Sequence, residues 1–365
     1  MKKKKIKVIT VGSASSVKGG ITSVITQIME HNWDVDGVDM EFVSTFAGGN
    51  ALNKVTAFAE GYARLLAKMI VDKPDVLHIH MSHSGSFSRK YLVHKLCKSF
   101  NVADIIHLHS SEFVQFYANA SPKKKAQITE LLTDCNAVVA LGDEWEQRIK
   151  KIAPKATVVV MNNTIALPDE VSAQECDEVK FLYLGVLVKR KGIIDLLKAV
   201  QRVKDEGFFE KHKAVFNIGG TGECEVELKN FVNDHGLESI VNFLGWVVGE
   251  GKKAQLKKNQ VFVLPSYNEG LPIAILEAIS YGMPVISTNV GSVAEAVRPE
   301  NGYLYKPGDI DALCVAIKDI LLHNEKRISM AKASRKLAED VFDDKKYFAR
   351  LKSLYQEVMT SEGMQ

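Results

Sequence analysis

The chain has 365 residues, of which 46% are hydrophobic and 25% charged, a composition that excludes a disordered or fibrous protein and is typical of a soluble globular one. Five scattered cysteines argue against a disulfide framework or a zinc site and fit a reducing cytoplasm. The net charge of +3 combines a basic excess in residues 1–165 with an acidic excess in the rest, which indicates either an anionic partner for the first half or ordinary solvated charge.

Short apolar runs alternate with helical patterns along the whole chain. The first series of predicted strands is Lys5–Gly12, Val38–Ser44, Asp75–His80, Ala103–His109, Ala137–Leu141 and Ala156–Met161. The second series is Val179–Gly185, Lys213–Gly219, Val241–Gly245, Val261–Pro265 and Pro284–Thr288. Near-continuous apolar strands separated by helices predict α/β domains with parallel sheets covered on both faces.

The two series predict two doubly wound, Rossmann-like domains, with the break at Asn162–Glu178, where no clear period is present. The start, MKKKKIKVITVG, has too short an apolar run for a signal peptide, so we expect a strand preceded by a lysine cluster. No run of 18 apolar residues suggests a membrane span. Because ligands of parallel sheets bind beyond the carboxyl ends of strands, the loops at those ends are the candidates for chemistry.

Glycines follow the first predicted strand, in GSASSVKGGITSV. Gly19 and Gly20 precede a predicted helix whose free N–H groups suit an anion, although a plain turn explains a glycine pair equally well. The spacing matches neither the dinucleotide fingerprint nor a P-loop.

Histidines cluster where the third and fourth strands end, in HIHMSHS and HLHSSEF. Their period of two places His78 with His80, and His107 with His109, on one face of each strand, which raises the question of a metal site. Only Glu112 accompanies them as a carboxylate. We therefore expect His78 and His107 to pack inside and His109 to face the ligand.

The second domain begins with a basic turn, Lys189-Arg190-Lys191, at the start of a predicted helix. Cations at this end oppose the helix dipole, so a bound anion would relieve the conflict. An exposed basic turn is the alternative.

The stretch NEGLPIAILEAIS contains Glu269 in a turn and Glu277 within an apolar helix. Pro272 suits the first helical position, so the N–H groups of Gly270 and Leu271 could face a phosphate. A buried carboxylate such as Glu277 needs a partner, and two adjacent hydroxyls of a ribose are a natural one, with an internal cation as the other option.

VFVLPSYNEGLPIAILEAISYGMPVISTNVGSVAEAV, with its E-x7-E pair, strongly resembles the donor-site signature of retaining glycosyltransferase family 4, within the glycosyl transferases group 1. LGVLVKRKG, the GG loop, HLHSSEF and NGYLYKPGDIDAL also resemble that family. The resemblance implies a GT-B fold, with an acceptor-side domain at 1–165, a nucleotide-sugar domain at 179–341 and a final helix, 342–360, that packs back on the first domain.

The resemblance also implies roles for individual residues. Glu277 would hold the ribose hydroxyls and stay unsatisfied until they bind, Lys191 would hold the diphosphate, and Glu269 would hold the transferred sugar. The N–H groups of Gly270 and Leu271 would contact the donor, His109 would line the sugar site, and Gly19 with Gly20 would approach the phosphates. The family usually has arginine where this chain has Val186, so we expect Arg190 or Lys189 to supply the second cation.

The predicted activity is transfer of a hexose from a nucleoside diphosphate sugar, UDP being favoured, to a hydroxyl of a glycan or lipid-linked acceptor, with retention by a front-face route. Asp34-Val35-Asp36 and Asp309-Ile310-Asp311 are interpreted as chance matches to a metal motif. We expect no metal, no other cofactor and no nucleic-acid partner.

The basic segments Arg89–Ser99 and Ser121–Lys125 suggest contact with anionic lipid, so we expect a cytoplasmic protein, with attachment to the inner membrane face as a hypothesis. Two other classes remain: a sugar-nucleotide 2-epimerase of the same fold, which needs no acceptor, and a non-catalytic sugar-nucleotide-binding subunit.

Overall fold

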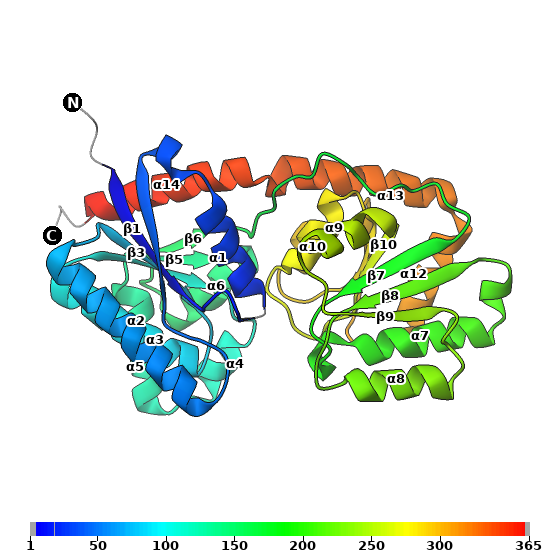
Figure 1. Ribbon diagram of the computed structural model, residues 1–365, viewed down its shortest axis with the longest axis horizontal. Helices are drawn as coiled ribbons and strands as arrows, with labels where there is room; N and C mark the ends of the chain where they lie inside the picture. The colour runs from blue at the N-terminus through cyan, green and yellow to red at the C-terminus, as the bar shows by residue number, and fades with distance from the viewer. Residues whose placement is uncertain (1–4, 18, 362–365) are drawn as a thin grey trace. The chain divides into compact units, whose positions relative to one another are not determined.

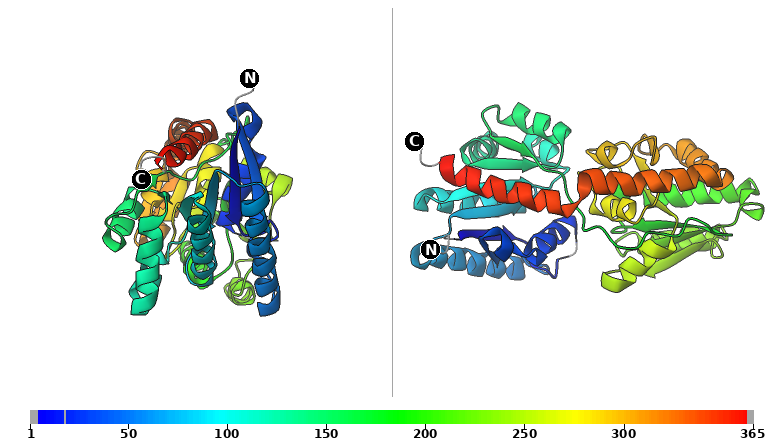
Figure 2. Two further views of the ribbon diagram at one scale, coloured as in Figure 1. Left: turned by 90° about the vertical axis from the view of Figure 1, so that its left-hand side faces the viewer. Right: turned by 90° about the horizontal axis from the view of Figure 1, so that it is seen from above.

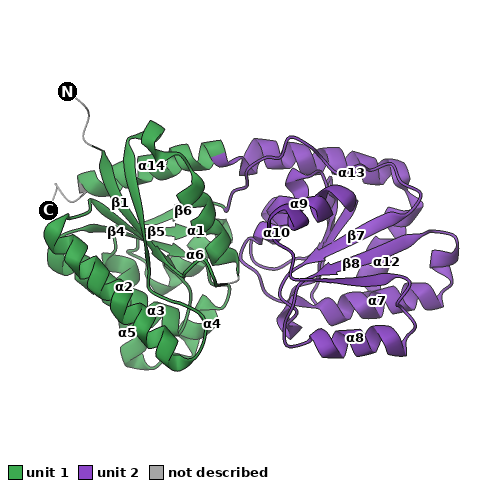
Figure 3. Cartoon of the chain, in the orientation of Figure 1, with its two compact units in different colours: residues 1–162, 345–365 green, residues 163–344 purple. Residues whose placement is uncertain are grey.

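The computed structural model describes residues 5–17 and 19–361, and divides the chain into two compact units (Figures 1 and 3). Unit 1 comprises residues 1–162 and 345–365, and unit 2 comprises residues 163–344. The lysine cluster expected before the first strand lies mostly outside the described residues.

Unit 1 contains a parallel six-stranded sheet with the strand order β2-β1-β3-β4-β5-β6. Its strands are β1 (Ile6–Gly12), β2 (Val38–Ser44), β3 (Val76–Met81), β4 (Ala103–Leu108), β5 (Ala137–Ala140) and β6 (Val158–Val160). Its helices are α1 (Gly20–Glu30), α2 (Ala51–Val71), α3 (Gly85–Phe100), α4 (Phe113–Ala118), α5 (Pro122–Asp134), α6 (Asp143–Ile152) and α14 (Asp344–Ser361).

The two faces of this sheet differ in chemistry. One hydrophobic cluster joins alternate strand residues, such as Leu77 and Ile79, to side chains of α2, α3, α5 and α6. The residues between them point to the opposite face, where His78 Nδ1 lies 2.9 Å from the hydroxyl of Tyr355 in α14. Figure 2 shows α14, in red, along this sheet. The last helix of the chain therefore covers a polar, buried face of the unit 1 sheet.

Unit 2 contains a second parallel six-stranded sheet, with the order β12-β11-β10-β7-β8-β9. Its strands are β7 (Val179–Leu184), β8 (Ala214–Gly219), β9 (Val241–Gly245), β10 (Val261–Leu264), β11 (Val285–Thr288) and β12 (Gly302–Tyr305). Its helices are α7 (Ile193–Asp205), α8 (Glu225–Asp234), α9 (Gly249–Lys258), α10 (Ile273–Ser280), α11 (Val293–Ala296), α12 (Ile310–Leu322) and α13 (Asn324–Leu337).

The predicted fold class, two doubly wound parallel sheets, is confirmed, and every predicted strand is present. The edge strand β12 was not among the predicted strands, because its four residues lie in a turn-rich stretch with too short an apolar run. Within the described residues, no helix combines the length and apolar character that crossing a membrane requires.

Candidate active site

The loops of unit 2 that follow β7 and β10 lie at the point where the strand order reverses. β7 pairs with β10 on one side and with β8 on the other, so the chain leaves these two neighbouring strands in opposite directions. Ligands of open parallel sheets bind at such a point, beyond the carboxyl ends. The first loop carries the basic turn and the second carries NEGLP, so the topology brings the two predicted donor-binding segments together.

Lys191 and Glu269 form an ion pair across this point. Lys191 Nζ lies 2.5 Å from Glu269 Oε1, and the two side chains are 15% and 9% exposed. They are 78 residues apart in sequence, and only the adjacency of β7 and β10 joins them. Because removal of one partner from a largely buried pair leaves an uncompensated charge, the two groups depend on each other.

The backbone of the basic turn packs directly on the loop after β10. The peptide N–H of Tyr267 donates to the carbonyl of Arg190 at 2.8 Å. Gly192 has φ 66°, and a Cβ there would come within 1.9 Å of the carbonyl oxygen of Pro265, so only glycine fits. Lys191 points inward, whereas Arg190 and Lys189 are exposed.

The chain segment at 270–273 presents free backbone donors. In the described part of the chain, the N–H groups of Gly270, Leu271 and Ile273 donate to no protein atom. Their carbonyls are anchored instead: Ser292 N donates to Gly270 O at 2.9 Å, and the Asn163 amide donates to Leu271 O at 2.7 Å. A fixed loop at the start of α10 with unused N–H groups is suited to an anion.

Glu277 has a partner that the sequence did not reveal. It was predicted to stay unsatisfied until a ribose binds, and this is wrong, because Lys252 of α9 forms an ion pair with it. The Glu277 side chain is 14% exposed, and burial raises the pKa of its carboxyl group, while the Lys252 charge opposes the rise. Nothing in the sequence distinguished Lys252 from Lys253, which pairs with exposed Glu250.

The two Asp-x-Asp matches have structural partners. Asp34 pairs with Lys5, and Asp36 pairs with His31 and Lys352. Asp309 caps α12 by accepting from Ala312 N at 2.9 Å, and Asp311 pairs with Arg202. These contacts support their interpretation as chance matches.

In unit 1, the glycine pair begins α1. Gly19, the residue before the helix, has φ 149°, a conformation that L side chains rarely adopt. A Cβ at Gly19 or Gly20 would meet none of the atoms described around it within 4 Å. The open space and the first N–H groups of α1 leave room for a ligand.

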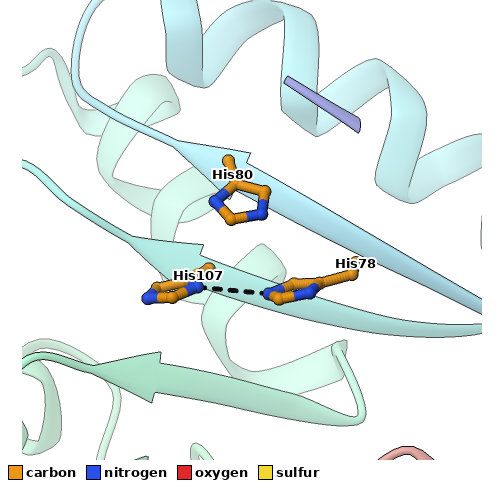
Figure 4. Close-up of side chains that lie close together, drawn as sticks. All are labelled: His78, His80 and His107. Atoms are coloured by element: carbon orange, nitrogen blue, oxygen red, sulfur yellow. Dashed lines mark hydrogen bonds between the residues drawn. The ribbon is translucent and has the colours of Figure 1, made fainter. Parts of the chain in front are cut away.

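Three buried histidines of β3 and β4, His78, His80 and His107, appear in Figure 4, and they form a network with His109, which follows β4. His78 Nε2 lies 3.2 Å from His107 Nδ1, and His80 Nδ1 lies 2.9 Å from His109 Nε2. Burial lowers the pKa of His78 and His109 to about 3 and that of His80 and His107 well below the usual value. His78 and His107 are fully buried as expected, and His109 is partly exposed at the end of β4.

The ring nitrogens of His78, His80 and His107 lie within 4.8 Å of one another, a spacing that could hold a metal ion. Hydrogen bonds within the protein already involve four of the six ring nitrogens of these three histidines. Glu112, the carboxylate noted beside them, pairs with His83 at 3.2 Å. We interpret the cluster as a hydrogen-bonded network, and the absence of a metal stays a prediction.

Residues 169–337, within unit 2, match the family model described as glycosyl transferases group 1. A curated relative, the UDP-Gal:alpha-D-GlcNAc-diphosphoundecaprenol alpha-1,3-galactosyltransferase of Escherichia coli, is 26% identical over 343 residues, which cover 90% of this chain and 86% of that protein. Unit 2 of the chain thus matches the group 1 glycosyltransferases, and the curated relative that resembles nearly the whole chain is also a glycosyltransferase.

Solved structures of this glycosyltransferase fold are similar over nearly the whole chain. Sucrose-phosphate synthase from Thermosynechococcus elongatus superposes with a TM-score of 0.83 at 18% identity, covering 98% of this chain and all of that one. HepE of Anabaena, in complex with UDP and glucose, gives a TM-score of 0.76 at 15% identity, covering 96% and 100%. These similarities confirm the GT-B fold.

Proposed function

We propose that this glycosyltransferase is a retaining enzyme that transfers a hexose from a UDP-sugar to a hydroxyl of a glycan or lipid-linked acceptor in surface polysaccharide synthesis. The name of the E. coli relative supports a UDP donor and a lipid-linked acceptor, and the UDP complex of HepE supports the same base. The observation that carries the proposal is the ion pair between Lys191, in the loop after β7, and Glu269, in the loop after β10. The loop after β10 also contains the free N–H groups of Gly270 and Leu271.

The donor diphosphate would bind where positive charge is available. Lys191 supplies an ammonium group. The segment at 270–273, which directly follows Glu269, the ion-pair partner of Lys191, supplies backbone N–H groups. On binding, the diphosphate would compete with Glu269 for Lys191, which frees the Glu269 carboxylate to accept hydrogen bonds from sugar hydroxyls. Glu277, which is paired with Lys252, would accept hydrogen bonds from the two ribose hydroxyls.

In the reaction, the bond between the anomeric carbon and the leaving phosphate oxygen breaks, and a bond from that carbon to the acceptor oxygen forms. The acceptor proton passes to the departing diphosphate, on the same face of the sugar, so the configuration is retained. Lys191 and the N–H groups would stabilise the negative charge that develops on the leaving oxygen, usually the largest contribution in such catalysis. This role for Lys191 requires no metal ion.

The proposed contact with anionic lipid has fewer exposed basic residues behind it than the sequence suggested. In the basic segment at 89–99, Lys90 and His94 are buried, and Lys95 pairs with Glu130. The hypothesis of an anionic lipid surface therefore rests mainly on the segment at 121–125, where Lys123 is exposed.

The proposal is tested by measuring the binding and slow hydrolysis of UDP-, GDP- and ADP-sugars by the full chain. We expect a UDP-sugar to bind, Glu277→Ala to weaken its binding, and Glu269→Ala mainly to lower turnover. If no nucleoside diphosphate sugar binds, the transferase function is wrong. Isomerisation of the donor sugar without any acceptor would favour the epimerase instead.

A second experiment, with an added acceptor, determines whether the sugar keeps its anomeric configuration during transfer. Proton NMR of the product distinguishes retention from inversion at the anomeric carbon. An inverted product would contradict the front-face route even if the donor and its binding residues are correct.

A further inference from the structure

Two cations of unit 1 lie near the carboxyl edge of its sheet without an anionic partner. Lys90 in α3 is only 2% exposed, and its ammonium donates to the hydroxyl of Thr45. Arg89 is partly buried, and its guanidinium lies 4.6 Å from the centre of the Phe46 ring. Within residues 5–17 and 19–361, neither side chain forms an ion pair, and Arg89 Nε has no hydrogen-bond acceptor.

An ammonium buried without a counter-charge is costly, and a methionine of similar length would avoid the cost. Burial, with the nearby charge of Arg89, lowers the pKa of Lys90 to about 7. Strongly shifted groups of this kind gather at functional sites. The chain therefore keeps a destabilising charge at a position where an apolar residue would pack.

The position of the two cations places them beside the loops that were predicted to carry chemistry. They reach consecutive residues, Thr45 and Phe46, that directly follow β2. Phe46 O accepts from Ala14 N at 2.8 Å, which joins this loop to the one after β1 that leads to Gly19.

The turn into α3 is also unusual. Ser84, which precedes the helix, has φ 53° and ψ −120°, a conformation rarely adopted by residues other than glycine. Backbone outliers of this kind are common at ligand sites, and this one lies at the reversal of strand order, between β1 and β3.

We propose that Arg89 and Lys90 form a binding site for one anionic group, a phosphate or a carboxylate, carried by the sugar acceptor. The planar guanidinium matches either anion with two parallel hydrogen bonds, and the ammonium adds a point charge. The assignment to the acceptor rests on the proposed function, in which Lys191 and the N–H groups of unit 2 already serve the donor diphosphate.

Calorimetric titration of the full chain tests the site. With the donor site saturated by UDP, the chain is titrated with methyl phosphate, glucuronate and, as a neutral probe, methyl glucoside. We expect at least one of the two anions to bind and the glucoside not to bind. Arg89→Gln and Lys90→Met should each weaken anion binding by at least ~tenfold, since each removes a charge-assisted contact. Lys155→Met, which removes an exposed cation of the same unit, should have no effect.

The outcomes separate this inference from the proposed function. Failure of UDP and of every UDP-sugar to bind would remove the transferase function, whereas the anion titrations without UDP would still test the two cations. If UDP binds and neither anion does, or if both variants bind anions as the unaltered chain does, the inference is wrong. If the anions bind only when UDP is absent, the cations serve the donor diphosphate, and the assignment to the acceptor is overturned.

The relative affinity of the two anions identifies the source of the charge. Tighter methyl phosphate binding indicates a phosphate-bearing, lipid-linked acceptor, and tighter glucuronate binding indicates an acidic sugar. Circular dichroism of each variant verifies folding, and Arg89→Gln, at a partly exposed position, provides the test even if Lys90→Met fails to fold.

Discussion

Both units contain a parallel six-stranded sheet, but the carboxyl edges of the two sheets differ in how their buried charges are paired. In unit 2, the buried acids are matched by cations, Lys191 with Glu269 and Lys252 with Glu277. In unit 1, the buried groups are neutral histidines, and beside them Arg89 and Lys90 have no counter-charge among the described residues. A parallel sheet thus fixes where a ligand binds but leaves the charge of the site to the loop residues.

The difference suggests how each unit meets its ligand. In unit 2, a diphosphate that formed an ion pair with Lys191 would break the pair between Lys191 and Glu269, and Glu269 would become free to bind another group. An unpaired site gains a first partner when an anion binds, so the ligand itself removes the cost of the buried charge. Substitutions that alter one side of this contrast are its sharpest tests.

Replacement of Lys191 should have the largest effect. Lys191→Met removes the cation proposed to stabilise the leaving diphosphate, so turnover should fall by roughly 10²–10³-fold. Glu269 would also lose its partner at 2.5 Å. Lys198→Met, which alters an exposed lysine on neighbouring α7, is the control and should retain most activity. Equal turnover in both variants would show that the pair in unit 2 has no catalytic role.

Neutralisation of Glu277 should have the next largest effect. Glu277→Gln keeps the size of the side chain but removes the charge proposed to accept hydrogen bonds from the ribose hydroxyls, so UDP affinity should fall by roughly 10–100-fold. Glu250→Gln, which alters an exposed acid on neighbouring α9, should bind UDP normally. Calorimetric titration with UDP measures both, and equal affinities would exclude Glu277 from the donor site.

Lys90→Met should change the pH dependence of stability. The folded-state pKa of Lys90 is about 7, against about 10.4 for an unfolded lysine, so between these values the unfolded state binds more protons and stability rises with pH. The charged residue facing it is Arg89, and His80 stays neutral in this range. The variant should be more stable than the unaltered chain by an amount on the order of 4 kcal/mol below pH 7. This difference should shrink toward pH 10.

Urea unfolding at several pH values measures that difference. A constant gap between the two proteins from pH 7 to pH 10 would show that Lys90 is not a buried, uncompensated charge. Addition of methyl phosphate should narrow the gap below pH 7, because the anion binds more tightly to the chain that keeps Lys90 and so stabilises it more.

The histidine network gives the smallest expected effect, because its protonation should not change with pH near neutrality. Burial holds the pKa of His78 and His109 near 3, so their ring signals in NMR should not move between pH 5 and pH 8. Exposed His323 serves as the internal comparison. A network histidine that titrates near pH 6.5 would show that water reaches this part of unit 1.

Local pattern was enough to predict the architecture of this chain. Apolar runs of strand length, helical spacing between them, and glycine or proline at the turns depend on neighbouring residues, and they located both sheets and the loops at their carboxyl ends. The apolar surroundings of Glu277 were readable for the same reason.

Partners that are distant in sequence were decided only by tertiary structure. Lys191 meets Glu269 because β7 and β10 are neighbours in the sheet, and His78 meets Tyr355 across 277 residues because α14 belongs to unit 1. Lys252 and Lys253 look alike in the sequence, yet one pairs with a buried acid and the other with an exposed one. Residue type limits which charges can pair, but the path of the chain through space selects the pair.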